Sequence, residues 1–272
     1  MKLISFDPLR TLGLPGVRYI KPDSMLAHLD EIRDADWVLF PEYWQINTLL
    51  YALKKRIFPS PASYYLGHNK IEQTRAFQAI CPQHLPKTAI HGSSRRALYQ
   101  LLDEFALPLV AKAIKSSRGE GVALLKTEAE LFDWAANHET LYIQEKLPID
   151  RDLRVVWVGD DILDAYWRIA PQGQFLNNLS QGGQISREAI PQAALDLVTS
   201  LARQVGIDHG GFDLAVVDGW PYLFEFNRLF GNQGMLVGQK SNSELLLRYL
   251  QQPEDRRFHK PAASGMTDLS DI

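Results

Sequence analysis

The sequence predicts an α/β protein with both parallel and antiparallel sheets. In the first 55 residues, short apolar strand patterns alternate with helix patterns, and this alternation indicates a small parallel sheet. Further along, two apolar runs joined by Gly159 and Asp160, and two more joined by Asp218 and Gly219, are typical of antiparallel hairpins. The 272 residues are 46% hydrophobic, which is enough for a sizeable core in one large or two to three small domains.

Composition and charge exclude several classes of protein. A net charge of −3 and a pI near 6.2, with no strongly basic stretch, argue against a general nucleic-acid binder. The single cysteine, Cys81, rules out an internal disulfide framework and fits a reducing compartment. The N-terminal apolar run is too short for a secretory signal, and no apolar stretch reaches the ~18 residues of a membrane span. We therefore expect a cytoplasmic protein without membrane or nucleic-acid partners, and we leave its oligomeric state open.

A short supporting domain is expected over residues 1–67. Residues 2–6 and 37–41 are typical of buried strands, a helix is expected over about 23–32, and a further helix over 44–55. The strands are expected to be parallel because a helix connects them. No glycine fingerprint for a nucleotide occurs in this unit.

A domain boundary is expected near residue 67. The run Pro59, Ser60, Pro61 breaks the preceding pattern, and Asn69 and Lys70 then begin a helix of about ten residues. We therefore predict that a second, larger unit begins at about residue 68.

A glycine-bearing flap is predicted in the next segment. Residues 109–115 are typical of a strand whose apolar pattern Lys112 interrupts, and a second strand pattern begins at residue 122. The small-residue loop 116–121 joins them, and its glycines would let backbone N–H groups approach phosphates closely. The alternative is an ordinary turn.

Several elements then lead toward the C-terminal hairpin. A helix is expected over 128–137, a strand over 141–148, a hairpin from strands 153–158 and 162–169, and a helix over 192–206. Arg168 breaks the apolar pattern of the second hairpin strand. A final helix is expected over 241–250, and the composition of residues 252–272 is typical of a disordered tail.

The hairpin over 210–227 carries three polar oxygen donors at Asp213, Glu225 and Asn227. A three-residue turn over 218–220 would place Asp213 opposite Glu225, with Asn227 on the same face. A five-residue loop would pair Asp213 with Asn227 instead. A loop of two or four residues would put Asp213 on the face opposite the other two.

An odd loop therefore predicts a cluster of hard oxygen donors. Like charges that face each other across two strands are destabilising unless a cation lies between them, and carboxylate and amide oxygens suit Mg²⁺. The alternative is the solvated polar face of an ordinary hairpin.

Taken together, these pieces resemble the ATP-grasp superfamily, and most closely its RimK-like carboxylate–amine ligases. The resemblance covers roughly residues 68–240. It is carried, in order, by Asn69 and Lys70, 108–112 with 119–122, 142–145, 152–154 with 158–160, Arg168, Asn178 and Leu179 with Gly182 and Gly183, 211–213, and 224–227.

The resemblance implies an ATP-grasp fold in which two lobes clasp ATP, preceded by a short α/β pre-ATP-grasp domain. The pre-ATP-grasp domain would cover 1–67 and the ATP-grasp domain 68–251. Within the latter, the flap lobe would cover about 85–146 and the metal-binding lobe about 147–251.

The resemblance also implies the ligands of ATP. Lys70 and Lys112 would contact phosphates, and the backbone centred on Glu145 would bind adenine. Asp152 would bind the ribose, with Asp150 as the alternative. The whole predicted ATP site comprises Lys70, Lys112, Ser116, Ser117, Gly119, Gly121, Gln144, Glu145, Lys146, Leu147 and Asp152.

The remaining implied roles concern the metal and the substrates. Asp213, Glu225 and Asn227 would hold one or two Mg²⁺ ions, with Mn²⁺ as a substitute. Arg168 and Asn178 would face the γ-phosphate and the acyl group. Arg154 is assigned with them to catalysis, and both Arg154 and Arg228 could bind a substrate carboxylate or phosphate.

The implied function is an ATP- and Mg²⁺-dependent ligase that activates a carboxylate as an acyl phosphate and joins it to an amine, with an amino acid or peptide as substrate. Two alternatives stay open, an ATP-grasp kinase and a non-catalytic nucleotide-binding protein. Three features depart from the family pattern. Gln181 stands where a basic residue is common, Arg228 stands where small residues are common, and the first domain is short.

Overall fold

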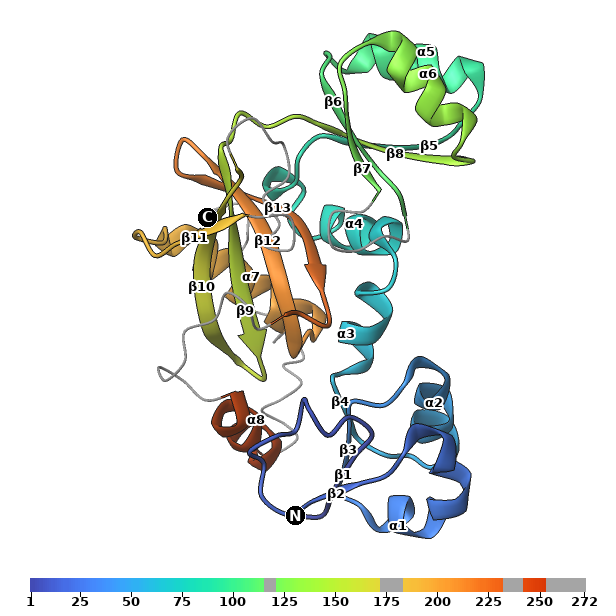
Figure 1. The fold of residues 1–272 in the computed structure, drawn as a ribbon, viewed down its shortest axis with the longest axis vertical. Coiled ribbons are helices and arrows are strands. Elements are labelled where there is room, and N and C mark those ends of the chain that lie inside the picture. The colour runs from blue at the N-terminus through green and yellow to red at the C-terminus, as the bar shows by residue number, and fades with distance from the viewer. Residues whose placement is uncertain (115–120, 172–182, 232–241, 253–272) are drawn as a thin grey trace.

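The structure is a computed structural model that describes residues 1–114, 121–171, 183–231 and 242–252. It contains three sheets with helices packed on them, so the predicted α/β class is confirmed (Figure 1). Of the helices in these ranges, none has the length and apolar character needed to cross a membrane. The predicted tail over 253–272 lies outside the described residues.

The first sheet is parallel, as predicted, and its strand order is β2-β1-β3-β4. Strands β1 (Leu3–Ser5) and β3 (Trp37–Leu39) confirm the two predicted strands. Strands β2 (Val17–Tyr19) and β4 (Ile57–Phe58) were not predicted, because two or three residues are too few to show an alternating pattern.

The helices around the first sheet correct the prediction of two regular helices. The segment that begins at Pro22 is a 3-10 helix, η1 (Pro22–His28), followed by α1 (Leu29–Asp34). The second predicted helix begins as α2 (Tyr43–Asn47) and continues as a π-helix, η2 (Thr48–Ala52). Pro22 favours the first turn of a helix because its φ angle is already fixed near the helical value.

The second sheet packs with two helices, α5 and α6, within the range predicted for the flap lobe. Its strands are β5 (Thr88–Gly92), β6 (Leu109–Lys112), β7 (Val122–Leu125) and β8 (Thr140–Glu145), in the antiparallel order β5-β8-β6-β7. Helices α5 (Arg95–Glu104) and α6 (Glu128–Ala136) lie together over one side of this sheet (Figure 1). Thr127 and Glu130 form a capping box that begins α6. The pairing of β6 with β7 confirms the two predicted strands of the flap.

The third sheet is antiparallel, with the strand order β11-β10-β9-β12-β13. Its strands are β9 (Arg151–Val158), β10 (Asp161–Ile169), β11 (Gln184–Ser186), β12 (His209–Val217) and β13 (Trp220–Asn227). Helix α7 (Gln192–Val205) packs on one face and ends at Gly206, which has the left-handed φ of 77° that glycine adopts at low cost.

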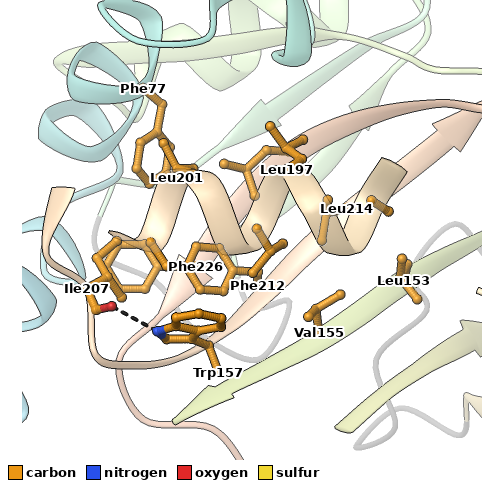
Figure 2. Close-up of a cluster of buried hydrophobic side chains, with 14 of the residues drawn as sticks. Phe77, Leu153, Val155, Trp157, Leu197, Leu201, Ile207, Phe212, Leu214 and Phe226 are labelled. Carbon is orange, nitrogen blue, oxygen red and sulfur yellow. Dashed lines mark hydrogen bonds between the residues drawn. The ribbon is translucent and has the colours of Figure 1, made fainter. Parts of the chain in front are cut away.

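A buried apolar cluster fills the space between α7 and this sheet. Figure 2 shows Leu197 and Leu201 of α7 beside Phe212 and Phe226 of the hairpin. The indole Nε1 of Trp157 donates a hydrogen bond to the carbonyl oxygen of Ile207 at 2.9 Å. Every second residue of β9 points into this cluster, so the residues between them are left for the opposite face.

The opposite face of the third sheet is apolar at one end. There Val156 and Val158 of β9 share one cluster with Trp37 and Phe58 of the first sheet and with Tyr249 of α8 (Asn242–Gln251). The first sheet, α8 and the third sheet are therefore packed around a common core.

A group of buried polar residues, hydrogen-bonded around Asp208, lies next to this shared core, where α3 (Pro61–Leu66) begins. Ser60 caps α3, its backbone N–H donates to Oδ1 of Asp208 at 2.7 Å, and the Ser63 hydroxyl donates to the same oxygen at 3.0 Å. The Tyr249 hydroxyl donates to Oδ2 at 3.4 Å. Burial raises the pKa of Asp208 to about 7 despite these hydrogen bonds. Burial also lowers the pKa of the neighbouring His209 to about 3.

These two residues should make opposite contributions to the pH dependence of stability. Asp208 keeps its proton in the folded protein up to about pH 7 but loses it above about pH 4 when unfolded, so its contribution falls as pH rises between these values. His209 stays neutral when folded but gains a proton below about pH 6.5 when unfolded, so its contribution falls as pH drops toward 3. Between about pH 4 and 6.5, raising the pH therefore lowers the contribution of Asp208 to folding stability and raises that of His209.

We therefore expect Asp208→Asn to lose more thermal stability than the wild type between pH 6.5 and 4.5, and His209→Gln to lose less. The change in Tm between pH 6.5 and 4.5 should differ between the two variants by about 3 °C or more. Melting curves by circular dichroism at several pH values measure it. Profiles parallel to the wild type for both variants would contradict the opposing contributions.

Candidate active site

A charged face lies at the other end of the third sheet, on the side away from α7. The cross-strand register pairs Asp213 of β12 with Arg154 of β9, and Arg168 of β10 with Asp152 of β9. Directly opposed residues share a face, so these four side chains lie together with Glu225 of β13, which pairs with Asp213. The charged face thus gathers two predicted metal ligands and three other predicted site residues.

The hairpin of β12 and β13 confirms the predicted pairing of Asp213 with Glu225, but by a different geometry. Val217 pairs with Trp220, so the turn has two residues, and Asp218 and Gly219 both have positive φ angles of 52° and 82°. The predicted three-residue turn is wrong. The register shifts by one residue between Asp213 and Leu214, and this β-bulge restores the pairing that a two-residue turn would otherwise break.

The bulge also turns an aromatic side chain toward the charged groups. Phe224 is the additional residue on β13, and its ring centroid lies 5.1 Å from Nζ of Lys112. Asn227 donates from Nδ2 to Oε1 of Glu225 at 3.1 Å. The three predicted metal ligands Asp213, Glu225 and Asn227 are therefore neighbours, with an aromatic ring beside the lysine predicted to bind phosphate.

Asp213 lies at the centre of a buried ion-pair network. It accepts hydrogen bonds from Nε and Nη2 of Arg154 at 2.5 and 3.0 Å, and Nη2 of Arg168 lies 2.9 Å from its Oδ1. Arg168 also binds both oxygens of Asp152, at 2.8 and 2.6 Å. Burial opposes the charge of Arg168, but the two carboxylates outweigh it and raise the pKa of Arg168. Asp213 is only 7% exposed, so the alternative of a solvated polar face is wrong.

Two lysines compensate Glu225. Nζ of Lys70, at the start of α4 (Lys70–Gln78), lies 3.2 Å from Oε2 of Glu225. Burial would raise the pKa of Glu225, but Lys70 and Lys112 prevail and lower it, so the carboxylate is ionised. Burial lowers the pKa of Lys112, and Glu225 opposes that shift. Asn69 caps α4 by accepting from the N–H of Ile71, which fixes the position of Lys70.

The donors of the hairpin fit a hard divalent cation. Asp213 and Glu225 already neutralise protein cations, and ionised carboxylates are the form that a metal requires. Within the described ranges no group of three or more His, Cys, Asp or Glu side chains could hold a metal, so the third donor here would be the amide of Asn227. Among the described residues, this region brings four basic side chains (Lys70, Lys112, Arg154 and Arg168) together with three acidic ones (Asp152, Asp213 and Glu225), a setting that suits a polyphosphate anion.

A positioning residue that the sequence did not indicate is Gln73 of α4. Its amide pairs with both backbone groups of Phe226, Nε2 donating to the carbonyl at 3.0 Å and Oε1 accepting from the N–H at 2.9 Å. Nε2 also donates to the carbonyl of Leu66 at 3.1 Å. Phe226 lies between Glu225 and Asn227, so Gln73 takes the place of a neighbouring strand beside the predicted metal ligands.

Gln73→Leu should therefore destabilise the protein by about 2–4 kcal/mol, because it leaves buried backbone groups of Phe226 without partners. Urea unfolding measures the loss. Gln78→Leu, on the exposed side of the same helix, is the matched control and should stay within about 0.5 kcal/mol of the wild type. Equal effects of the two substitutions would contradict the role given to Gln73.

The predicted adenine segment lies at the end of β8. Gln144 is buried and donates from Nε2 to the hydroxyl oxygens of Thr88 and Tyr142, at 3.0 and 3.2 Å. The backbone N–H of Glu145 donates to the carbonyl of Lys87 at 3.0 Å, so its main chain already pairs with the chain before β5. Lys146 and Leu147 follow beyond the strand end.

The remaining predicted residues fall into two groups. Gly121 is described, with a φ of 75° and a carbonyl that accepts from the N–H of Ala113 at 2.6 Å. Asp150 is exposed, whereas Asp152 lies within the charged face. The loop residues Ser116, Ser117, Gly119, Asn178 and Gln181 lie outside the described residues.

A comparison with protein families matches residues 70–246 to a family described as the RimK-like ATP-grasp domain. Curated relatives include a probable alpha-L-glutamate ligase of Citrobacter koseri and a ribosomal protein bS6–L-glutamate ligase of Escherichia fergusonii. Each is 30% identical over 173 residues, which is 60% of this chain and 57% of the relative. The chain thus spans less than two thirds of the length of these relatives.

Solved structures with similar folds include ligases and a macrocyclase. The macrocyclase MdnC of Microcystis aeruginosa, bound with its precursor peptide MdnA, aligns with a TM-score of 0.67 at 15% identity, over 93% of this chain and 100% of that chain. The D-alanine–D-alanine ligase of Bacillus anthracis gives 0.64 at 15% identity, over 89% and 87%. A RimK domain ATP-grasp protein of Sphaerobacter thermophilus gives 0.58 at 14%, over 80% and 82%. These likenesses confirm the predicted fold.

Proposed function

The chain belongs to the family of RimK-like ATP-grasp domains, and from this premise we propose that it is an ATP- and Mg²⁺-dependent ligase that joins a carboxylate to an amine. The observation that carries the proposal is the charged face, where Asp213, Glu225 and Asn227 adjoin buried cations. An acyl phosphate would be the activated form of the carboxylate, and an amino acid or peptide the substrate. The proposed domain limits remain 1–67 and 68–251.

The chemistry requires two anions to approach each other. A carboxylate oxygen forms a bond to the γ-phosphorus while the bond to the β–γ bridging oxygen breaks, and ADP leaves. An amine then attacks the acyl carbon, phosphate leaves with the electrons of the broken C–O bond, and the nitrogen loses a proton. The barrier lies mainly in bringing like charges together, so fixed cations in a dry site can lower it substantially.

The residues of the charged face have distinct proposed roles. Asp213, Glu225 and Asn227 would hold Mg²⁺, which when bound supplies positive charge to the β- and γ-phosphate oxygens. Lys70 would exchange its contact with Glu225 for a phosphate, and Lys112 would hold a second phosphate oxygen. Each exchange keeps the buried charges compensated.

Further residues would bind the nucleotide and orient the acyl group. Arg168 and Arg154, held by Asp213 and Asp152, would present rigid guanidinium groups to the γ-phosphate and the acyl oxygen. Gln144, Glu145, Lys146 and Leu147 would contact adenine. Asp152 would have to share its Arg168 contact to bind the ribose, and the exposed Asp150 is the alternative. Ser116, Ser117, Gly119, Gly121 and Asn178 keep the roles that the family resemblance implies.

The proposal is tested by measuring ADP release from ATP and Mg²⁺ with pooled amino acids and peptides. Product masses identify an amide, and hydroxylamine added to the reaction should trap the acyl phosphate as a hydroxamate. A stable phosphorylated substrate would indicate a kinase instead. Calorimetry that detects no Mg²⁺-dependent ATP binding would overturn the proposal.

A further inference from the structure

One buried hydrogen bond joins the second sheet to α4. The hydroxyl oxygens of Thr74 on α4 and Tyr142 on β8 lie 2.7 Å apart, and the two residues are 5% and 1% exposed. Leu141 and Ile143, on either side of Tyr142, belong to the apolar cluster of the second sheet. Side chains alternate along a strand, so Tyr142 lies on the opposite face, which is turned toward α4.

The direction of this hydrogen bond follows from its neighbours. The Thr88 hydroxyl donates to the carbonyl of Pro86 at 2.7 Å, so its oxygen is left to accept from Nε2 of Gln144 at 3.0 Å. The same amide nitrogen donates to the hydroxyl oxygen of Tyr142 at 3.2 Å. Since the Tyr142 oxygen accepts here, its proton is available for Thr74. A chain of hydrogen bonds thus runs from α4 across β8 to the beginning of β5.

Helix α4 is also tied to the hairpin that carries the predicted metal ligands. Gln73, the residue before Thr74, holds both backbone groups of Phe226. Lys70, one turn earlier, contacts Glu225. One short stretch of a helix, residues 70–74, therefore holds β8 on one side and β13 on the other.

Apolar packing does not fix the second sheet in the same way. Its buried cluster draws on residues 89–143 alone, whereas the first and third sheets share a core. The chain enters and leaves this unit through two short connections, 85–87 and 146–150. The orientation of the second sheet over the third therefore depends mainly on these connections and on polar contacts such as the one between Thr74 and Tyr142.

Lys112 is the group whose position depends most on this orientation. It extends from β6 on the same face as Tyr142, because Ala111 before it belongs to the apolar cluster. Its Nζ lies 6.0 Å from the ring centroid of Tyr142 and 5.1 Å from that of Phe224 on β13. A second sheet that turned away from α4 would carry the ammonium group away from Phe224 and from Glu225, whose pKa it helps to lower.

We infer that Thr74 and Tyr142 are positioning residues, whose hydrogen bond holds Lys112 and Gln144 at a fixed distance from the predicted metal ligands. The inference rests on the proposed function, because one nucleotide would contact both sheets. Neither hydroxyl touches the nucleotide itself. Without the hydrogen bond, binding has to order the second sheet as well, and the affinity for the nucleotide falls by that amount.

The first test measures the orientation of the second sheet without any ligand. Tyr142→Phe and Thr74→Val each delete one hydroxyl at nearly constant volume, whereas Thr74→Ser keeps it. Spin labels are attached to the full chain at Asp133→Cys on α6 and Gln204→Cys on α7, both exposed, after the buried Cys81 is replaced by alanine. Electron paramagnetic resonance should give one narrow distance distribution for the wild type and Thr74→Ser, and a broader one for Tyr142→Phe and Thr74→Val.

The second test measures nucleotide affinity in the same variants. Calorimetry with Mg²⁺ and a non-hydrolysable ATP analogue should show a Kd about fivefold or more above the wild type in Tyr142→Phe and in Thr74→Val. Thr74→Ser should bind like the wild type. The double variant of Tyr142→Phe and Thr74→Val should be no weaker than either single variant, because the hydrogen bond can be lost only once.

Tyr64→Phe is the matched control. It also removes a buried hydroxyl that donates a hydrogen bond, here to the carbonyl of Pro41, but both partners lie within residues 1–67. The distance distribution and the nucleotide affinity should therefore stay as in the wild type.

The outcomes separate this inference from the proposed function. Broader distances and weaker binding in Tyr142→Phe and Thr74→Val, both restored in Thr74→Ser, support the positioning role. Unchanged distances or unchanged affinity in those two variants overturn it, and so does a Thr74→Ser variant as defective as Thr74→Val. A wild type that does not bind MgATP overturns the proposed function, and the distance distributions then decide separately whether the hydrogen bond orients the second sheet.

Discussion

Replacing Glu225 with alanine is expected to lower ATP-dependent turnover by about 10³-fold or more. The substitution removes one of three adjacent oxygen donors and the carboxylate that interacts with Lys70 and Lys112. The loss of metal charge beside the phosphates should raise the barrier more than it weakens nucleotide binding, because that charge acts mainly on the transition state. Initial rates at saturating ATP, with Mg²⁺ varied, measure the effect.

Two further variants sharpen this test. Glu225→Gln keeps the shape of the side chain and should be nearly as defective, since a neutral amide cannot replace the charge. Asp196→Ala removes an exposed acid on α7 and should retain full activity. Asp213→Ala is also expected to abolish turnover. Near-normal activity in Glu225→Ala or Asp213→Ala would mean that the metal is held elsewhere.

Replacing Arg168 with leucine is expected to destabilise the protein by about 3–5 kcal/mol. Arg168 is 5% exposed and compensates both Asp152 and Asp213, so its removal leaves a buried carboxylate without its main partner. Urea unfolding with an unchanged m-value would show that the effect is on stability alone. Activity should fall as well, because Asp213 then depends on Arg154 for its orientation.

The double variant Asp152→Leu and Arg168→Leu should recover much of that loss, because it removes both buried charges of the pair. The double-mutant cycle then gives a coupling free energy well above the error of the measurement. Arg33→Leu is the control for an exposed pair, since Arg33 and Asp30 are 56% and 97% exposed, and it should cost less than about 1 kcal/mol. Additive effects of the two buried substitutions would show that the pair is not coupled.

The sequence was sufficient to predict the hairpin and its acids, but not the length of its turn or the β-bulge between the acids and the turn. Asp218 and Gly219 indicate a turn because both accept positive φ angles, and a loop with an odd number of residues would place Asp213 and Glu225 on one face. Counting residues from the turn gave the wrong loop length, because a bulge adds one residue and no side chain is diagnostic of a bulge. The predicted pairing of Asp213 with Glu225 was right, although the predicted turn length was wrong.

Partners that are distant in the sequence were beyond prediction for a related reason. Gln73 and Phe226 are 153 residues apart, and a buried glutamine in a helix has no pattern that reveals the strand it contacts. Lys112, by contrast, was noticed because it interrupts an apolar strand. Arg168 was noticed in the same way, but its pairing with Asp152 follows from the register of β9 and β10, which the sequence does not specify residue by residue.

The core shared by the first sheet, the third sheet and α8 has a consequence for how the chain unfolds. Because Phe58, Val158 and Tyr249 pack in one cluster, these segments should lose structure together as a single cooperative unit. The second sheet and helices α5 and α6 have their own cluster, which includes Leu101 and Ile143, and they can therefore open with a separate, smaller free energy. Hydrogen exchange should resolve two classes of slow amides. The segment matched by the family, 70–246, thus cuts through the larger unit and is not a natural place to truncate the protein.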